Sequence, residues 1–463
     1  MTERITCVSP VDGRIYASRP VATKRAIAAT FDAARKAQAQ WARVPLAERT
    51  AYCSAAVDAM LAMKDEIVPE LAWQMGRPIR YGPGELRGFE ERARYMIAIA
   101  EQALADIDPG PKEGFLRYVR RDPVGVVFTI APWNYPYLTA VNSVIPALMA
   151  GNTVVLKHAA STLLVAERFQ QAFDRAQLPK GVFQHLVLSH PQVGEIIARG
   201  LANMVCFTGS VAGGRAMEAA AAGRFINVGL ELGGKDPAYV RPDADLPHAI
   251  ENLVDGAFFN SGQSCCAIER IYVHRKVWDD FLDGFVELTR KYMLGSPLDE
   301  ATTLGPMVRR EAAAFVRKQV TAAVRAGARA HIDPRTFPMD KPGTPYMAPQ
   351  VLTDVTHRMS VMRDESFGPV IGIMKVAGDR EAIDLMNDSP YGLTAAIWTE
   401  DVEAAQSIGR EIATGTVFMN RCDYLDPALT WTGVKDTGRG ATLSRVGYEA
   451  LTRPKSYHLR TRT

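Results

Sequence analysis

A cysteine follows a glycine-containing turn in the segment Asn260-Ser-Gly-Gln-Ser-Cys265-Cys266. A thiol at the start of a loop or helix lies near backbone N–H groups, which lower its pKa and favour the thiolate. A thiolate placed in this way is a nucleophile. The commoner role of an unpaired cysteine is that of a small core residue. The local sequence therefore leaves both roles open for Cys265.

A glutamate interrupts an apolar run in Asn227-Val-Gly-Leu-Glu231-Leu-Gly-Gly-Lys235. Desolvation in such a strand raises the pKa of a carboxyl group toward the range of a general base. Two structural roles are equally compatible with the pattern. Glu231 caps a neighbouring helix, or it pairs with Lys235.

Three further segments carry groups of the right type for a reaction on a carbonyl. Asn134, held between Pro132 and Pro136, presents a rigid amide N–H to an oxyanion, although Asn and Pro also simply mark turns. Phe207-Thr-Gly209-Ser210 leads from a strand into a helix, where a Gly-Ser turn suits a pyrophosphate, but it is not the GxGxxG fingerprint. Glu365-Ser-Phe367-Gly-Pro369 is uninformative alone.

The elements that position these residues change in character along the chain. Apolar residues at helical spacing predict a helix over 27–41, followed by helices over about 45–76 and 84–107. From Val124 onward, short apolar runs alternate with helical stretches, which indicates βαβ units and a doubly wound parallel sheet. The predicted strands lie at 124–130, 152–157, 204–209, 225–232, 268–273, 369–375, 394–398 and 415–419. We therefore predict an α/β protein of two lobes with a boundary near residue 235.

Composition excludes several classes of protein. The chain has 463 residues, of which 47% are hydrophobic and 23% charged, and its net charge is +3. These values are ordinary for a globular protein and predict no nucleic-acid or membrane partner. The uncharged stretch 123–156 contains four prolines, which favour a buried core with turns over a membrane span. Six cysteines without paired or metal-ligand spacing, and no signal pattern at the N-terminus, predict reduced thiols in a cytoplasm and no metal site.

In their order and spacing these segments resemble the aldehyde dehydrogenase superfamily, in its NAD(P)-dependent, non-acylating form. The motifs that carry the resemblance are PWNYP, GNTVVLK, FTGS, LELGGK, GQSC, ESFGPV, GTVFMN and GVKDTG. No single motif is specific, but the combination is, and it covers essentially the whole chain. The resemblance implies two Rossmann-like lobes and a small β oligomerisation arm.

The resemblance also implies a role for each segment. Cys265 would attack an aldehyde, Asn134 with the Cys265 backbone N–H would hold the oxyanion, and Glu231 would activate the water that hydrolyses the thioester to the acid. The cofactor would be NAD or NADP. The implied cofactor-binding residues are Trp133, Lys157, Gly209, Ser210, Leu232, Glu365 and Phe367.

The implied domain organisation follows the same motifs. Residues 1–110 and 124–234 would form the cofactor-binding domain, and 235–425 the catalytic domain. Residues 111–123 and 441–463 would form the oligomerisation arm of a homodimer or homotetramer.

Three departures from the family pattern affect these expectations. Ala160 stands where a ribose-binding glutamate often follows Lys157, so we expect NADP to be used as well as NAD. Thr442 replaces a second glutamate of many members, and the segment 429–433 departs from the usual PFGG; the sequence assigns no effect to either. The acidic segment 421–426 near the expected tunnel mouth favours neutral or cationic aldehydes, or is merely a solvated loop in which Arg421 pairs with an aspartate.

Two other functions compete with this interpretation. A coenzyme-A-acylating enzyme would pass the acyl group to coenzyme A rather than to water, and Glu231 argues against it. A non-catalytic relative with a binding or structural role would not need Cys265, Glu231 and Asn134 together.

Overall fold

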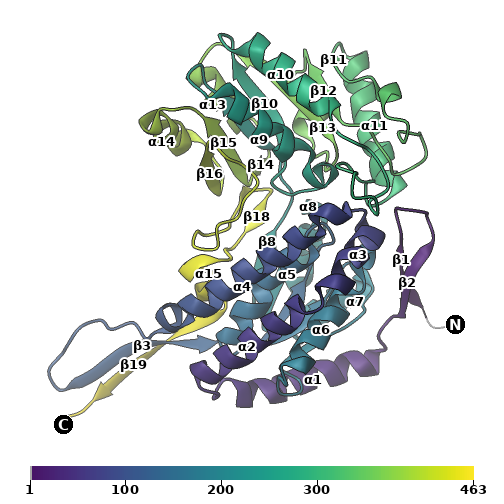
Figure 1. Ribbon diagram of the computed structural model, residues 1–463. Helices are drawn as coiled ribbons and strands as arrows, with labels where there is room; N and C mark the ends of the chain where they lie inside the picture. The colour runs from purple at the N-terminus through teal and green to yellow at the C-terminus, as the bar shows by residue number, and fades with distance from the viewer. Residues whose placement is uncertain (1–2, 463) are drawn as a thin grey trace.

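The computed structural model describes residues 3–462 as two α/β lobes and a projecting two-stranded ribbon (Figure 1). The first lobe contains a six-stranded sheet of order β18-β8-β7-β4-β5-β6. All of its strand pairs are parallel except β18 with β8. The strands are β4 (Val126–Ile130), β5 (Thr153–Lys157), β6 (Phe183–His185), β7 (Met204–Thr208), β8 (Asn227–Glu231) and β18 (Gly438–Arg439).

Helices cover both faces of this sheet because alternate strand residues point to opposite sides. Val127 and Val154 pack with α2 to α6 and α15, whereas Val126 and Phe128 pack with α1, α7 and α8. The helices of this lobe are α1 (Lys24–Trp41), α2 (Leu46–Leu61), α3 (Lys64–Met75), α4 (Gly82–Leu104), α5 (Pro136–Met149), α6 (Val165–Arg175), α7 (His190–Ala198), α8 (Val211–Ala221) and α15 (Ser444–Ala450), with short 3₁₀ turns η1 (Ile79–Tyr81) and η2 (Ala160–Thr162).

The second lobe contains a seven-stranded sheet of order β11-β12-β13-β10-β9-β15-β16, parallel except for β11. It is also covered on both faces. Its strands are β9 (Asp236–Val240), β10 (Ile268–His274), β11 (Arg329–Ala330), β12 (Gln350–Thr353), β13 (Val370–Val376), β15 (Thr394–Trp398) and β16 (Thr416–Met419). Its helices are α9 (Leu246–Phe258), α10 (Trp278–Arg290), α11 (Arg310–Arg325), α12 (Ser360–Arg363), α13 (Asp379–Asn387) and α14 (Val402–Glu411), with η3 (Phe259–Gly262) and η4 (Pro334–Thr336). These two sheets confirm the predicted doubly wound α/β class.

The N-terminal region differs from the predicted helices in two places. Residues 4–20, which precede the first predicted helix, form an antiparallel hairpin of β1 (Arg4–Val8) and β2 (Ile15–Pro20), which docks through buried Cys7 against Leu163. The helix expected over 45–76 is broken at residues 62–63. Because of this break, α2 packs on α6 and α3 packs on η2. One straight helix would not make both contacts.

The ribbon pairs two segments that are distant in sequence. β3 (Phe115–Pro123) runs antiparallel to β19 (Thr452–Arg460) and extends away from both lobes (Figure 1). The preceding α15 packs on α4 of the first lobe, and β14 (Tyr391–Gly392) pairs with β17 (Val434–Lys435). None of the helices in residues 3–462 is long and apolar enough to cross a membrane.

Candidate active site

The nucleophile segment is preceded by an unusual backbone. After α9, residues Asn260, Ser261 and Gly262 all have left-handed φ values of 53°, 58° and 69°, a conformation that is strained for residues other than glycine. A side chain at Gly262 would lie 2.3 Å from the Gly368 carbonyl oxygen. The Asn260 amide stabilises the turn by donating to the carbonyl of Gln263 at 3.1 Å. This turn delivers Cys265 to the junction of the two lobes.

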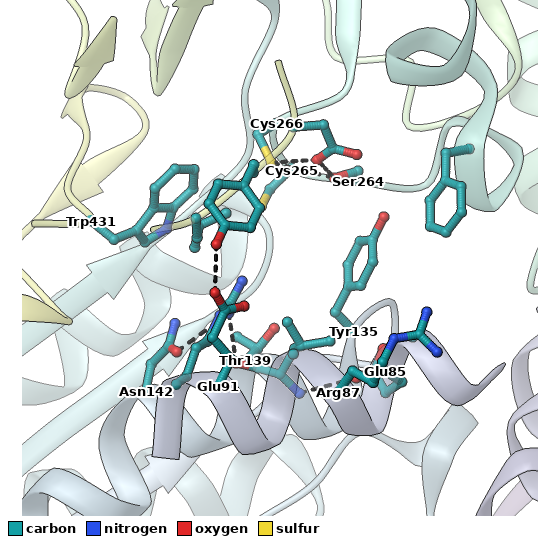
Figure 2. Close-up of a pocket in the computed structure, with 18 of the residues that line it drawn as sticks. Glu85, Arg87, Glu91, Tyr135, Thr139, Asn142, Ser264, Cys265, Cys266 and Trp431 are labelled. Carbon is teal, nitrogen blue, oxygen red and sulfur yellow. Dashed lines mark hydrogen bonds between the residues drawn. The ribbon is translucent and has the colours of Figure 1, made fainter. Parts of the chain in front are cut away.

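The two neighbouring cysteines have different environments (Figure 2). Cys265 is half-buried, whereas Cys266 is 3% exposed. The Cys266 thiol donates to Asp423 Oδ1 at 2.9 Å, and the Ser264 hydroxyl donates to the same oxygen at 3.1 Å. The hydrogen bond with Cys265 and burial raise the pKa of the Cys266 thiol. Cys266 is thus held as a thiol donor, while no carboxylate in the described chain holds the Cys265 thiol.

Glu231 ends β8 with both carboxylate oxygens occupied by hydroxyl donors. The Thr442 hydroxyl donates to Oε1 at 2.6 Å and the Thr208 hydroxyl to Oε2 at 3.0 Å. Burial raises the pKa of Glu231, and the two hydroxyls oppose that rise. Lys235 pairs instead with Glu269, which excludes the alternative pairing of Glu231 with Lys235.

Asn134 lies just beyond β4, and hydrogen bonds hold both its side chain and its main chain. Its side-chain Nδ2 donates to the Gln263 carbonyl at 3.2 Å, and its main-chain carbonyl accepts from Arg77 at 2.5 Å and from Asn260 at 3.3 Å. An amide nitrogen carries two hydrogens, so one remains for an oxyanion beside Cys265.

An ion pair between Arg77 and Glu85 supports this loop. Both side chains are buried, and Glu85 also accepts from the backbone N–H groups of Tyr137 and Leu138, at 2.9 and 3.0 Å. Neither residue was predicted from the sequence, in which Arg77 directly follows the helix expected over 45–76. A glutamate among apolar and small residues of a helix, eight positions after that arginine, was the available signal.

A cavity of about 860 Å³ lies beside two of the three candidate catalytic residues. Its wall includes Cys265 and Glu231 together with α4, the start of α5 and the segment 422–425, as Figure 2 shows for part of the lining. A second cavity of about 390 Å³ shares Thr208 and Glu231 with the first. Glu231 therefore lies between the space beside the nucleophile and a second space behind it.

Lys157 and Ser210 lie at the carboxyl ends of β5 and β7. Lys157 is 8% exposed, burial lowers its pKa to about 8, and no carboxylate of residues 3–462 lies within 4.0 Å of its ammonium group. The Ser210 hydroxyl caps α8 by accepting from the Gly213 N–H at 3.2 Å. An unpaired buried cation and a nearby helix N-terminus fit the ribose and pyrophosphate of a dinucleotide.

The remaining predicted cofactor residues approach from both lobes. Glu365 accepts from the Gly234 N–H at 3.0 Å, and burial raises its pKa to about 7. The rings of Phe367 and Trp133 meet edge to face at 5.6 Å. Leu232 is buried directly after Glu231. Gly209 lies beside the Phe207 ring, which a side chain there would meet at 2.7 Å.

Comparison with known proteins agrees with this arrangement. The sequence model of the aldehyde dehydrogenase family matches residues 1–457. A succinate-semialdehyde dehydrogenase [NADP(+)] of Mycobacterium avium is 35% identical over 412 residues, which is 89% of this chain and 87% of that protein. An NAD-dependent aldehyde dehydrogenase from Sinorhizobium meliloti superposes with a TM-score of 0.93 at 32% identity, covering 99% of this chain and 92% of that one. A succinic semialdehyde dehydrogenase from Streptococcus pyogenes in complex with NADP+ superposes with a TM-score of 0.93 at 27% identity, covering 98% and 100%.

The fold and these matches define an oxidoreductase, and the chain belongs to the aldehyde dehydrogenase family. It oxidises an aldehyde to the carboxylic acid, with NAD or NADP as the cofactor.

Proposed function

We propose that Cys265, Glu231 and Asn134 carry out this oxidation. The observation that carries the proposal is that the Cys265 thiol and the Glu231 carboxylate line one cavity. Asn134 supports it, because its amide is fixed to Gln263, two residues before the nucleophile.

Each residue has a separate step. The Cys265 thiolate attacks the aldehyde carbon, and the resulting oxyanion accepts hydrogen bonds from the Asn134 amide and the Cys265 backbone N–H. NAD or NADP, held by the residues described below, would supply the acceptor for the hydride that leaves this carbon. The acyl group then remains on Cys265 as a thioester. Glu231 takes a proton from water, the hydroxide attacks the thioester, and the acid and a free thiol are released.

The seven predicted cofactor residues would hold the dinucleotide between the lobes. Lys157 would bind the adenosine ribose, and Gly209 and Ser210 the pyrophosphate at the start of α8. Glu365 would accept hydrogen bonds from the nicotinamide ribose. Phe367, Trp133 and Leu232 would pack beside the nicotinamide ring.

The same proposal covers assembly and location. In the β3–β19 ribbon, Ile107 bridges the outer edge of β3 at Val119. The outer edge of β19 is unpaired in the described chain, which suits pairing with another copy in a homodimer or homotetramer. Six free cysteines are consistent with a cytoplasmic protein.

Substituting each cysteine separately tests the nucleophile. Cys265→Ala should abolish aldehyde-dependent formation of reduced cofactor, whereas Cys266→Ala should retain most of it. Glu231→Gln should give at most one reduced cofactor per site in a rapid burst, followed by a very slow steady state, because thioester hydrolysis lacks its base. An active Cys265→Ala enzyme, or an unchanged steady state in Glu231→Gln, would refute the assignment. Acceleration by coenzyme A would instead identify the acylating reaction.

A further inference from the structure

Helix α4 places a buried cation without an anionic partner in the wall of the catalytic cavity. Arg92 is 8% exposed and lines this cavity. Its Nη1 donates to the Leu138 carbonyl at 2.8 Å and to Asn142 Oδ1 at 3.3 Å. Within residues 3–462, no carboxylate oxygen lies within 4.0 Å of the guanidinium, and Nε and Nη2 have no hydrogen-bond acceptor. The edge formed by these two nitrogens is therefore open to a ligand.

Three other arginines line this cavity. Arg77 pairs with Glu85, and Arg94 pairs with both Asp58 and Glu90. Arg87 is exposed, so water solvates its charge. Burying an unpaired charge is unfavourable, and within residues 3–462 Arg92 is the one buried arginine of the cavity without a carboxylate partner.

The acidic groups near Arg92 do not satisfy it either. Both Glu231 oxygens accept from threonine hydroxyls, and Asp423 accepts from Ser264 and Cys266. Glu91 accepts from the Tyr424 hydroxyl at 2.5 Å. An anion that enters with the substrate would complete the site.

We propose that Arg92 binds the carboxylate of an ω-oxo carboxylic acid whose aldehyde end reaches Cys265. The Nε–H and Nη2–H of a guanidinium form a planar fork that matches the two oxygens of a carboxylate. Arg92 and Cys265 line the same cavity, so one small molecule contacts both. This inference rests on the proposed function, and it names the substrate class. Two of the relatives described above are named for succinate semialdehyde, which belongs to this class.

The inference departs from the sequence-based expectation of neutral or cationic aldehydes. That expectation assigned the acidic segment 421–426 to the substrate. Asp423 instead faces Ser264 and Cys266, and Arg421 stacks on the Tyr424 ring at 3.9 Å rather than pairing with an aspartate of the described chain.

A pair of aldehydes, one with and one without a carboxylate, distinguishes carboxylate binding by Arg92 from a general effect of its charge on the cavity. Succinate semialdehyde and butanal share a carbon chain and differ by the carboxylate. The wild type should prefer succinate semialdehyde. Arg92→Gln should lower kcat/KM for succinate semialdehyde by about 10- to 100-fold, mainly through KM, and leave butanal unchanged, since hydrogen bonds to a charged group have this magnitude. Arg92→Lys should retain part of the preference. The control Arg94→Gln should retain all of it, because that guanidinium already pairs with two carboxylates.

Two results would overturn the role of Arg92 while leaving the proposed function intact. In the first, the wild type does not prefer succinate semialdehyde to butanal. In the second, Arg92→Gln lowers kcat/KM equally for both aldehydes. Failure of the wild type to oxidise either aldehyde, or any related one, would instead refute the proposed function. A measurement that needs no variant provides a second test: succinate should inhibit butanal oxidation by the wild type competitively, at concentrations at which butyramide does not. Equal inhibition by both compounds, or none by succinate, would also overturn the role.

Discussion

Replacing Thr442 by valine tests how the candidate base is tuned. The hydroxyl of Thr442 donates to Glu231 Oε1 at 2.6 Å, and valine removes this donor while keeping the branched shape. The backbone of Thr442 exchanges hydrogen bonds with Trp431 at 2.9 and 2.8 Å, and this bridge does not involve the side chain. The substitution therefore changes the environment of Glu231 with little effect on the surrounding fold.

The sign and size of the effect follow from the hydrogen bond. Burial already raises the pKa of Glu231, and the Thr442 and Thr208 hydroxyls oppose that rise by stabilising the ionised form. A hydrogen bond to a charged group contributes about 1.5–3 kcal/mol, which corresponds to roughly one to two pKa units at about 1.36 kcal/mol per unit. Glu231 is partly exposed to its cavity, so water replaces part of the lost bond, and we expect a rise of about one unit.

The low-pH limb of the profile of deacylation rate against pH reports the pKa of Glu231, because Glu231 acts as a base only when ionised. Thr442→Val should move that limb to higher pH by about one unit and slow deacylation about 10-fold below it, with no change well above it. The assay is decay of the acyl-enzyme, measured across pH by rapid quenching and mass spectrometry. Thr442→Ser retains a hydroxyl and should behave as the wild type. Identical limbs in the Val and Ser variants, or a shift to lower pH, would refute the reasoning.

Two further predictions concern the cofactor and the ribbon. Ala160→Glu should lower kcat/KM for NADP much more than for NAD, because the added carboxylate repels a 2′-phosphate. His158 adds no compensating charge, since burial lowers its pKa to about 3. An unchanged ratio of the two kcat/KM values would show that position 160 does not set the cofactor preference. Removal of residues 453–463 should convert the proposed homo-oligomer to monomers in sedimentation experiments, since β19 is half of the ribbon. An oligomer that survives the truncation would place the interface elsewhere.

The sequence alone was sufficient for eight strands of the two lobes and for the order of the motifs, but it did not predict β6, β9, β11, β12 and β18. Parallel strands buried on both faces appear as continuous apolar runs, which is why 204–209 and 268–273 correspond closely to β7 and β10. The α1 helix was also predictable from the sequence, because Ile27, Phe31 and Trp41 repeat at helical spacing, and all three are buried in the structure. The hairpin at residues 4–20 was missed, since its short strands have one exposed face and no long apolar run.

Only the tertiary structure decided how the chemical groups are paired. Glu231 accepts from Thr442, which is 211 residues away in the chain, and the Asn134 carbonyl accepts from Arg77, 57 residues away. Arg92 gave no signal in the sequence, because an arginine on a helix is ordinarily solvated. Its lack of an anionic partner became visible only when α4, α5 and η3 enclosed one cavity. Local pattern reports which residues are buried, but the partner of a buried polar group depends on which distant segments the fold brings within hydrogen-bond distance.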